Sequence, residues 1–568
     1  MTAASAPRPS ARTGRGDGRA GASASVDVQL AGPAERYSRN LFGHFVEHFH
    51  RQVYGGIFEP GSPLSDERGF RTDVVDALRE LAPPVVRWPG GCFVSSYHWL
   101  DGVGPDRRPH YDKAWRVTDP NTFGTAEFVA WCRAIGAEPY VCTNAGTGTA
   151  EEMSDWVEYC NAPAGSGRWA DLRAEHGSPE PFGVRFWSIG NENYGDWEMG
   201  AKTASEWASL VRESAKMMRH VDEDVTLLTA ARADLGWMVP LLEAAGPHLD
   251  QISIHGYWDT LNQVEAPSGY LTAVGHSLGP QHDIERARDI VGATGLGGRV
   301  GIAFDEWNLR GWHHPVGNRP EAIAARDLND VNATYTMADA LFSASFLNAC
   351  LRHADVVRMA NIAPTVNTRG PLFVHPTGLV RRTTFHVLAM YATLLGERVL
   401  PSTATSAGLV GADVPVVDQL ATVDAAGTRV SLVLVNRDPA ASTGCEVRLG
   451  GHVLTGTYDA TVLSGPSPDA YNDVDAPDRV VPVTGPVRFE DGRTTLPPHS
   501  LTVVHVPLPV PFGAGEAGVP QDVAADWHAT ARGWYRTTAG WAEGAAAARG
   551  GRSRASAPVA DALAVTSA

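Results

Sequence analysis

The sequence predicts an α/β protein: a (β/α)8 TIM barrel with a C-terminal all-β sandwich domain. Eight short apolar runs rich in β-branched residues, mostly separated by segments with helical spacing, predict the barrel. Short alternating runs bounded by turn signals after residue 397 predict the sandwich. A doubly wound open sheet is the structural alternative. Eight strand–helix units and the absence of a Gly-rich phosphate turn favour the barrel.

The barrel strands are expected in order along the first two thirds of the chain. They are the runs 41–46, 84–88, 138–142, 185–189, 226–230, 251–255, 300–304 and 356–362. Between them apolar residues recur every three or four positions, as in the segments 70–81, 128–135 and 204–221. This is the pattern of a helix with one buried face. A helical stretch at 386–395 is expected to end the barrel.

Four segments are predicted along the chain: 1–25, 26–397, 398–510 and 511–568. The first is expected to be disordered and the last is a low-complexity tail, because both consist mainly of small and polar residues. The second is the catalytic barrel and the third is the sandwich. The predicted sandwich strands are 419–423, 430–435, 445–449, 480–483 and 501–506. The strand-like run 26–30 precedes the barrel and is a candidate to pair with the sandwich.

Composition excludes several classes of partner. The 568 residues carry a formal net charge of −17 without a basic stripe, which argues against nucleic acid. The six cysteines are widely spaced and include no CxxC pair, which predicts free thiols in a reducing compartment. The first residues lack the apolar core of a secretory signal, and no apolar run approaches membrane-spanning length. We therefore expect a cytoplasmic protein without a membrane partner.

Two glutamates stand where an apolar run gives way to polar residues. Glu192 follows the run 185–189, and Glu306 follows the run 300–304. In a barrel of parallel strands the C-terminal strand ends meet at one face, where functional side chains gather. Glycoside hydrolysis requires a pair of carboxylates at such a face. One protonates the leaving oxygen, and the other attacks or supports the sugar.

Other polar residues fall at the same strand ends. They include Glu47, Arg87, Asn191, His255 and Tyr257, with Asn367 just after the last strand. Each alone is as readily a capping or loop residue. Together they predict a concave polar pocket.

A catalytic metal and a cysteine nucleophile are the alternatives at these strand ends. His44 and His48 point to one face of a strand and so suggest zinc, but neither an HExxH motif nor a third ligand accompanies them. Cys92 lies in a tight turn, yet no Cys–His arrangement follows from the spacing. We expect no metal and no cofactor.

At these residues the chain resembles glycoside hydrolase family 51, the α-L-arabinofuranosidases. The resemblance covers roughly residues 26–508. Its motifs, in order, are Phe42-Gly43-His44-Phe45-Val46-Glu47-His48, Val53-Tyr54-Gly55-Gly56-Ile57-Phe58-Glu59-Pro60-Gly61, Arg87-Trp88-Pro89-Gly90-Gly91-Cys92-Phe93-Val94-Ser95, Asp101-Gly102-Val103-Gly104-Pro105, Gly190-Asn191-Glu192 and Phe304-Asp305-Glu306-Trp307-Asn308. A lone Asn-Glu would be weak, but these motifs in this order and spacing are specific.

The resemblance implies a retaining, exo-acting hydrolase. It would remove terminal non-reducing α-L-arabinofuranosyl groups from arabinan, arabinoxylan or their oligosaccharides by double displacement. Glu192 would be the general acid and base, protonated because of burial and the charge of Glu306. Glu306 would be the nucleophile, ionised by Arg87 and Tyr257. Asn191 would hydrogen-bond the sugar 2-hydroxyl. The remaining family positions around the sugar are occupied by Phe45, Glu47, Cys92, Trp115, His255 and Tyr257.

Two positions depart from the family pattern. Cys92 stands where many members carry Asn, and Pro364 stands where a Gln commonly touches the sugar. Proline offers neither an amide side chain nor a backbone N–H, so one interaction with the sugar must be absent or made by another residue. Asn367 is the candidate replacement.

Two alternative functions and one expectation about assembly complete the sequence-based picture. A related retaining barrel acting on β-linked xylan or glucan is the first alternative function. A catalytically silent sugar-binding barrel is the second. Members of the family are often hexameric, so we expect a homo-oligomer.

Overall fold

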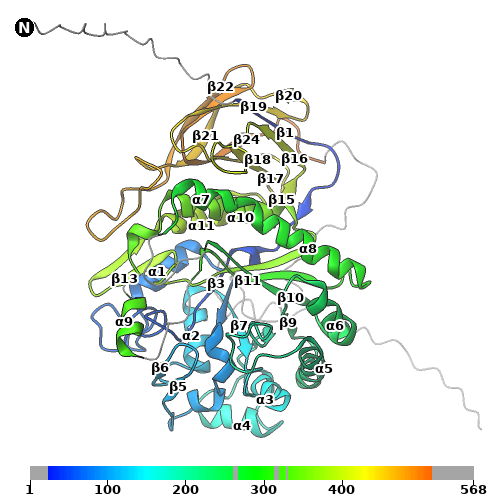
Figure 1. Cartoon of the computed structure of the whole chain (residues 1–568), viewed down its shortest axis with the longest axis vertical. Helices are drawn as coiled ribbons and strands as arrows, with labels where there is room; N and C mark the ends of the chain where they lie inside the picture. The colour runs from blue at the N-terminus through cyan, green and yellow to red at the C-terminus, as the bar shows by residue number, and fades with distance from the viewer. Residues whose placement is uncertain (1–22, 260–266, 312–318, 328–329, 514–568) are drawn as a thin grey trace, which may run out of the picture.

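Eight parallel strands close into a barrel, which confirms the predicted fold class. The computed structural model describes residues 23–259, 267–311, 319–327 and 330–513 (Figure 1). The strand order around the barrel is β10-β11-β12-β3-β4-β7-β8-β9. The bounds are β3 Gly43–Phe45, β4 Val85–Trp88, β7 Glu138–Thr143, β8 Phe186–Ile189, β9 Thr226–Ala230, β10 Gln251–Asp259, β11 Gly301–Arg310 and β12 Val357–Ile362.

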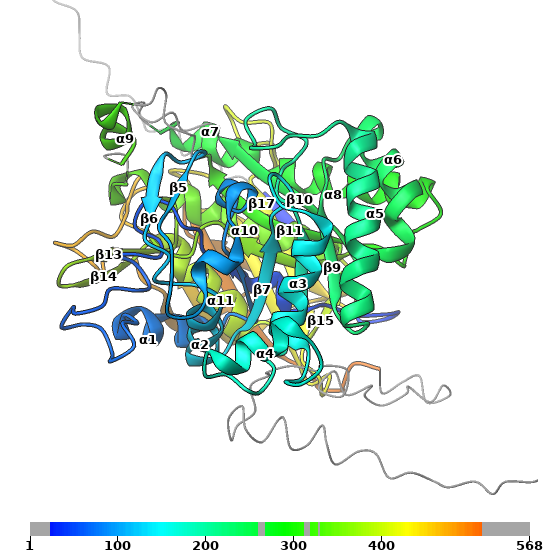
Figure 2. The same cartoon turned by 90° about the horizontal axis from the view of Figure 1, so that it is seen from below.

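Helices surround the barrel strands, as the view in Figure 2 shows for α2, α3, α5 and α6. The described α-helices are α1 Thr72–Leu81, α2 Thr125–Ile135, α3 Ala150–Asn161, α4 Arg168–Glu175, α5 Ala204–Val221, α6 Leu235–Ala245, α7 Tyr270–Gly275, α8 Gly279–Ala293, α9 Pro320–Asp327, α10 Met337–Arg352 and α11 Thr383–Leu394. Among the described residues, none of the helices is long and apolar enough to cross a membrane.

Helix α5 illustrates how local sequence sets a helix boundary and a buried face. Thr203 caps its first turn, and Glu206 reaches back to the Thr203 backbone N–H in a capping box. Trp207, Val211 and Met218 then recur on one face and are buried. That face packs against the strands, and the polar residues face outward.

Helices α10 and α11 lie between the barrel and the sandwich (Figure 1). Every residue of α10 from Met337 to Leu351 is buried, because this helix has packing partners on all sides. Asp418 of the sandwich accepts hydrogen bonds from Asn348 Nδ2 and Arg352 Nη1, each at 3.0 Å. These buried contacts hold the two domains together.

The β domain consists of a five-stranded sheet and a seven-stranded sheet. The first contains β1 Ser23–Val28, β16 Ser402–Ser406, β19 Thr443–Leu449, β20 His452–Val453 and β23 Arg493–Leu496. The second contains β2 Glu35–Arg36, β15 Arg398–Leu400, β17 Val417–Val423, β18 Arg429–Asn436, β21 Gly456–Leu463, β22 Val483–Phe489 and β24 Ser500–Pro507. Two small hairpins complete the described strands: β5 His110–Asp112 with β6 Val117–Asp119, and β13 Leu372–His375 with β14 Gly378–Arg381.

The structure corrects the predicted segments at several points. Strand β1 pairs with β16 and β19, so the start of the chain enters the sandwich and residues 23–25 are ordered in a strand. Most of the predicted N-terminal segment, 1–22, and most of the tail, 514–568, lie outside the described residues. The predicted strand 480–483 is wrong apart from Val483, where β22 begins. The short strands β2, β15, β16 and β20 were not predicted. Strands β21 and β23 were not predicted either. Their exposed and buried residues alternate with many polar side chains, which hides them in a search for apolar runs.

Strands β10 and β11 extend further than the apolar runs predict. Pairing between them continues from His255 with Glu306 to Asp259 with Arg310, after a register shift between Ser253 and His255. A second shift separates Phe304 from Trp307 in the pairing of β11 with β12. At such irregularities successive side chains no longer point to opposite faces of the sheet in strict alternation. Here the shifts lie on either side of the pairing of His255 with Glu306.

Candidate active site

Glu192 and Glu306 come together, as their positions at strand ends predict. Glu192 lies just after β8, and Glu306 lies within β11. Carboxylate oxygens of both residues and a ring nitrogen of His255 all lie within 4.8 Å of one another. The side chain of Glu192 is 14% exposed and that of Glu306 is 9% exposed. The two acids therefore form a close, nearly enclosed pair.

Arg87 and Tyr257 hold the Glu306 carboxylate from two directions. Arg87 Nη1 donates to Glu306 Oε2 at 2.8 Å, and the Tyr257 hydroxyl donates to Oε1 at 2.5 Å. Arg369 Nη2 in turn donates to the Tyr257 oxygen at 2.9 Å. Glu306 is thereby fixed in one orientation.

His255 joins the two glutamates. Its Nδ1 lies 2.8 Å from Glu192 Oε1 and 3.5 Å from Glu306 Oε2, and its Nε2 lies 3.4 Å from Asp305 Oδ1. Burial opposes the charged imidazole, but these three carboxylates outweigh it and raise the pKa of His255 to about 10. The imidazole is therefore a cation at neutral pH.

The protonation of Glu192 differs from the sequence-based expectation. Burial favours the neutral carboxyl, as expected. The hydrogen bond and charge of His255, aided by Trp197, nevertheless hold the pKa of Glu192 below its ordinary value. Trp197 Nε1 donates to Glu192 Oε2 at 2.8 Å. The proton for a leaving group is thus stored on the Glu192–His255 pair, principally on the imidazole.

The turn after β8 requires glycine at position 190. Gly190 has φ +69°, and a Cβ there would lie 2.3 Å from Asn193 Oδ1 and 2.4 Å from the Trp207 ring. Glu192 itself adopts φ +44°, a left-handed conformation uncommon outside glycine. This turn aims Asn191 and Glu192 into the site.

Glu47 is held by a glycine turn after β4. Its Oε1 accepts from the Phe93 backbone N–H at 3.0 Å and from Trp115 Nε1 at 2.8 Å. A Cβ at Gly91 would lie 2.3 Å from Glu47 Oε2, so only glycine permits this approach. Burial, reinforced by the charge of Glu306, raises the pKa of Glu47 to about 8.

Asn191 and Phe45 complete the wall around Arg87. Arg87 Nη2 donates to Asn191 Oδ1 at 2.6 Å, which leaves the Asn191 amide as the donor toward the site. The Arg87 guanidinium lies over the Phe45 ring, 4.9 Å from its centroid. Trp115 stacks on Phe49 at 3.8 Å. The residues predicted from the family motifs therefore lie close together around the two glutamates, with one exception.

Asn367 is that exception. Its Nδ2 donates to the Arg51 carbonyl at 2.5 Å, its Oδ1 accepts from the Val374 N–H at 2.8 Å, and the residue is fully buried. Both polar atoms are committed to the backbone of a turn in which Asn367 has φ +56°. The expectation that Asn367 binds the sugar in place of a side chain at Pro364 is therefore wrong. Arg369 lies closer to the two glutamates than Asn367 in its contacts, because it donates to the Tyr257 hydroxyl that in turn donates to Glu306.

The structure bears on both alternatives for these strand ends, a Cys92 nucleophile and a zinc site that includes His48. Burial, with the charges of Glu198, Glu192 and Glu47, raises the pKa of the Cys92 thiol well above its ordinary range, so the thiol is not a nucleophile. His48 has both ring nitrogens engaged, with Asp119 at 2.6 Å and with the Trp88 indole N–H at 2.7 Å. His48 is therefore not available as a zinc ligand.

Four functional neighbours were not predicted: Asp305, Trp197, Glu198 and Arg369. Asp305 accepts from Tyr140 at 2.6 Å and from Ser253 at 2.5 Å. Burial opposes its ionisation, but Arg87 and His255 lower the pKa of Asp305 to about 2. The position of Asp305 directly before Glu306 in the sequence could have indicated its role. The other three residues lie in loops whose partners are distant in sequence.

The structure also contains a cavity of about 630 Å³. It is lined by residues 48–51, 53–54 and 117–120, so the segments that follow Glu47 and Trp115 form its walls.

Family models match most of the barrel and sandwich. The alpha-L-arabinofuranosidase 1 domain matches residues 77–271, and the alpha-L-arabinofuranosidase C-terminal domain matches residues 305–500. The intracellular exo-alpha-(1→5)-L-arabinofuranosidase of Streptomyces lividans is 35% identical over 495 residues, which are 83% of this chain and 73% of that protein.

Solved structures agree in fold. The alpha-L-arabinofuranosidase of Thermotoga maritima, in an arabinose complex, is 31% identical with a TM-score of 0.76, over 86% of this chain and 100% of that chain. The GH51 enzyme of Thermotoga petrophila is also 31% identical with a TM-score of 0.76, over 85% of this chain and 100% of that chain. With the carboxylate pair described above, these matches show that the chain belongs to the α-L-arabinofuranosidases of glycoside hydrolase family 51.

Proposed function

We propose that this α-L-arabinofuranosidase is a retaining, exo-acting enzyme in which Glu306 is the nucleophile and Glu192 the acid and base. The observation that carries the proposal is the short separation of the two carboxylates, whose oxygens approach within 4.8 Å. Retaining glycosidases place the two groups about 5–5.5 Å apart, whereas inverting enzymes leave about 6.5–9.5 Å for a water molecule. An oxygen–oxygen approach within 4.8 Å supports the shorter, retaining separation.

In the first step Glu306 attacks the anomeric carbon and forms a covalent arabinosyl-enzyme. Arg87 and Tyr257 hold the carboxylate in position, since they donate to its two oxygens at 2.8 Å and 2.5 Å. As Glu306 becomes an ester, its carboxylate loses negative charge and binds the Arg87 guanidinium less strongly. The guanidinium can then stabilise negative charge on other oxygens nearby. Asn191 directs its amide toward the sugar 2-hydroxyl, a contact that strengthens as the oxocarbenium ion develops.

The leaving oxygen takes its proton from Glu192, which is resupplied by His255 at 2.8 Å. Esterification of Glu306 removes one of the anions that stabilise the imidazolium, so the proton passes more readily toward Glu192. Glu192 then acts as base and takes a proton from the water that hydrolyses the intermediate. The proton that departs with the leaving group in the first half-reaction is thus replaced by one from water in the second.

Burial of the nucleophile and of the side chains that contact it supports exo action. Arg87 and Asn191 are at most 1% exposed, and Glu306 is 7% exposed. Only a terminal sugar can reach atoms enclosed to this degree, whereas an internal residue of a polymer needs an open cleft. The substrates we propose are terminal α-L-arabinofuranosyl groups of arabinan, arabinoxylan and their oligosaccharides.

The experiment that tests this function compares nitrophenol release from three substrates by the purified protein. We expect fast turnover of p-nitrophenyl α-L-arabinofuranoside and little turnover of the matching β-D-xyloside and β-D-glucoside. Activity on the other two substrates alone would refute the proposal and favour a hydrolase of β-linked xylan or glucan.

We further propose a cytoplasmic location and a homo-oligomer, with a hexamer as the expected form. All six cysteines are buried thiols outside disulfides, as suits a reducing compartment. Light scattering after size-exclusion chromatography tests the assembly, since the monomer mass is 60.6 kDa. A mass near that value would refute the oligomer.

A further inference from the structure

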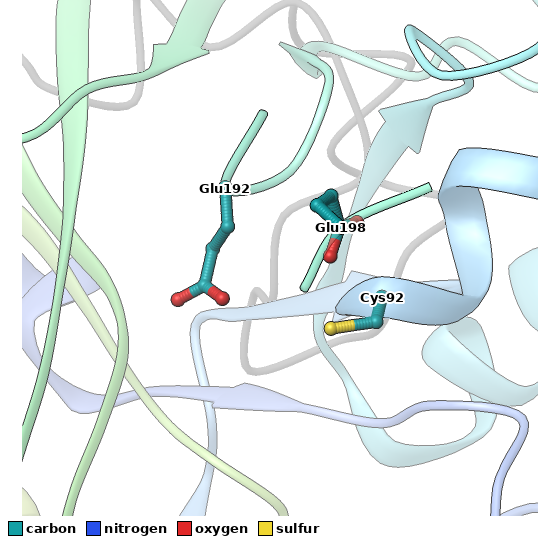
Figure 3. A group of neighbouring side chains, drawn as sticks. All are labelled: Cys92, Glu192 and Glu198. Carbon is teal, nitrogen blue, oxygen red and sulfur yellow. The ribbon is translucent and has the colours of Figure 1, made fainter. Parts of the chain in front are cut away.

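Three side chains from separate segments converge beside the carboxylate pair. Cys92 begins the turn after β4, Glu192 follows β8, and Glu198 lies further along the same loop. The Cys92 sulfur and one carboxylate oxygen from each glutamate all lie within 4.8 Å of one another. Figure 3 shows the three side chains pointing toward a common space.

Glu198 has an unexplained buried oxygen. Its Oε1 accepts from Ser95 Oγ at 2.5 Å and from Asn191 Nδ2 at 3.3 Å. Its Oε2 is inaccessible to solvent and has no nitrogen or oxygen donor as a partner within the part of the chain that the structure describes, while the Cys92 thiol hydrogen-bonds to this carboxyl group. The residue as a whole is only 3% exposed. A buried carboxylate oxygen without such a donor is costly, and a carboxyl group that also lies beside two other groups able to ligate a metal points to a ligand.

The surrounding carboxyl groups favour a cation as that ligand. Glu47, Glu192, Glu198 and Glu306 lie in or beside this space. Burial, with the charge of Glu306 on Glu47 and of Glu192 on Glu198, raises the pKa of both Glu47 and Glu198 to about 8, so these two groups hold a proton at neutral pH. The nearby cations already have partners, because Arg87 bonds to Glu306 and Asn191, and His255 bonds to Glu192. A divalent ion between Cys92, Glu192 and Glu198 would take the place of the Glu198 proton and of the thiol proton.

The donor set selects the kind of cation. One sulfur and two carboxylate oxygens suit Zn²⁺ or Co²⁺, which accept thiolate together with oxygen ligands and leave a fourth position for water. Mg²⁺ and Ca²⁺ prefer oxygen ligands alone, so the thiol disfavours them. The ion displaces the thiol proton and the proton of the Glu198 carboxyl group, so that the S–H and O–H bonds break, sulfur–metal and oxygen–metal bonds form and two H⁺ are released at neutral pH.

We infer that Cys92, Glu192 and Glu198 form an inhibitory binding site for a divalent cation of the Zn²⁺ type. A bound ion holds Glu192 as a ligand and removes it from proton transfer. It also fills space that the sugar and its leaving group need. Inhibition rests on the proposed role of Glu192, whereas binding of the ion does not.

Binding is tested first, without reference to activity. The full-length enzyme, freed of metal by a chelator, is titrated with Co²⁺ and followed by absorption spectroscopy. We expect one thiolate-to-cobalt charge-transfer band that saturates at one ion per chain, is displaced by Zn²⁺ and disappears in Cys92→Ser. Cys132→Ser is the matched control, because Cys132 is a buried cysteine of α2, and it should keep the band.

A second variant keeps the test independent of any folding defect in Cys92→Ser. Glu198→Gln preserves an oxygen for Ser95 and Asn191 but removes the ligating charge, so the dissociation constant for Zn²⁺ should rise at least tenfold. Absence of the band in the wild-type enzyme, its persistence in Cys92→Ser, or unchanged affinity in Glu198→Gln would overturn the site.

Inhibition is tested separately. Zn²⁺ should reduce arabinofuranoside hydrolysis over the concentrations at which it binds, in competition with substrate, and a chelator should restore activity. Binding without inhibition would overturn the inhibitory role and leave the ion site intact. An enzyme without arabinofuranosidase activity would contradict the proposed function while the cobalt spectrum still reported on the site.

Discussion

Nδ1 of His255 lies 2.8 Å from Oε1 of Glu192, and this contact determines where the catalytic proton is stored. The imidazole, with a pKa of about 10, carries the proton at neutral pH, and its charge lowers the pKa of Glu192. A glutamate that must donate a proton is thus supported by a histidine that holds one.

Replacement of His255 by Gln should move the pH dependence of the enzyme. The imidazolium lowers the pKa of Glu192 by its hydrogen bond and its charge, and burial raises that pKa. Without the imidazolium the effect of burial is less opposed, so the pKa of Glu192 rises. The pair that keeps its shared proton up to a pH of about 10 in the wild-type enzyme is lost, so the alkaline limb of the kcat/KM profile should move downward. The measurement is a pH–rate profile of both enzymes on an arabinofuranoside with a poor leaving group. A limb that stays in place or moves upward would contradict this role of His255.

Glu306→Ala should abolish turnover, with a loss of at least about 10⁴-fold in kcat, because no other carboxylate is placed to attack. Sodium azide provides the sharper readout. Azide entering the vacated space should attack from the opposite face and yield β-arabinofuranosyl azide. Detection of the α-azide from this variant would be inconsistent with Glu306 as nucleophile.

Glu192→Ala should discriminate between leaving groups. Substrates with poor leaving groups need the proton and should slow by about 10²–10⁴-fold, whereas activated aryl arabinofuranosides should slow far less in the first step. Steady-state kinetics on arabinobiose and on an activated aryl substrate make the comparison. An equal loss on both would count against the acid role.

Tyr257→Phe removes the hydroxyl that donates to Glu306 Oε1 at 2.5 Å and should lower kcat by about 10–100-fold. Tyr194→Phe is the matched control. Its hydroxyl reaches Glu192 Oε1 only at 3.4 Å, so the loss should be smaller. If the two variants lost the same activity, with unchanged thermal unfolding, positioning of Glu306 by Tyr257 would be excluded.

Asn367→Ala should affect stability rather than sugar binding. The substitution removes two buried hydrogen bonds to the backbone of Arg51 and Val374 and replaces Asn in a left-handed conformation. We expect the free energy of unfolding to fall by about 2–4 kcal/mol, with KM unchanged below the unfolding temperature. Denaturant unfolding and steady-state kinetics measure the two quantities. A large rise in KM without destabilisation would restore Asn367 to the sugar site.

Much of the fold could be predicted because buried parallel strands appear in sequence as continuous apolar runs. The runs ending at Ile189 and Ala230 coincide with the ends of β8 and β9. Strands β10 and β11 were predicted too short, since they continue through polar residues that the pocket, rather than the core, accommodates. β22 is an edge strand that contains Pro486, so its apolar pattern is weak.

The site was predictable where strand position and chemistry coincide, as for Glu192 and Glu306. It was not predictable where a residue acts through a partner far away in the chain. The role inferred for Glu198 depends on its closeness to Cys92, and that of Arg369 depends on its hydrogen bond to Tyr257. Both contacts exist only in the folded barrel. The state of the Glu192 proton likewise depends on a histidine two strands away.

The stereochemistry of hydrolysis tests the central claim most directly. Proton NMR of the first product released from p-nitrophenyl α-L-arabinofuranoside, acquired before mutarotation, identifies its anomer. With Glu192 and Glu306 oxygens within 4.8 Å of each other, double displacement should release α-L-arabinofuranose first. Initial release of the β-anomer would contradict the roles assigned to both glutamates.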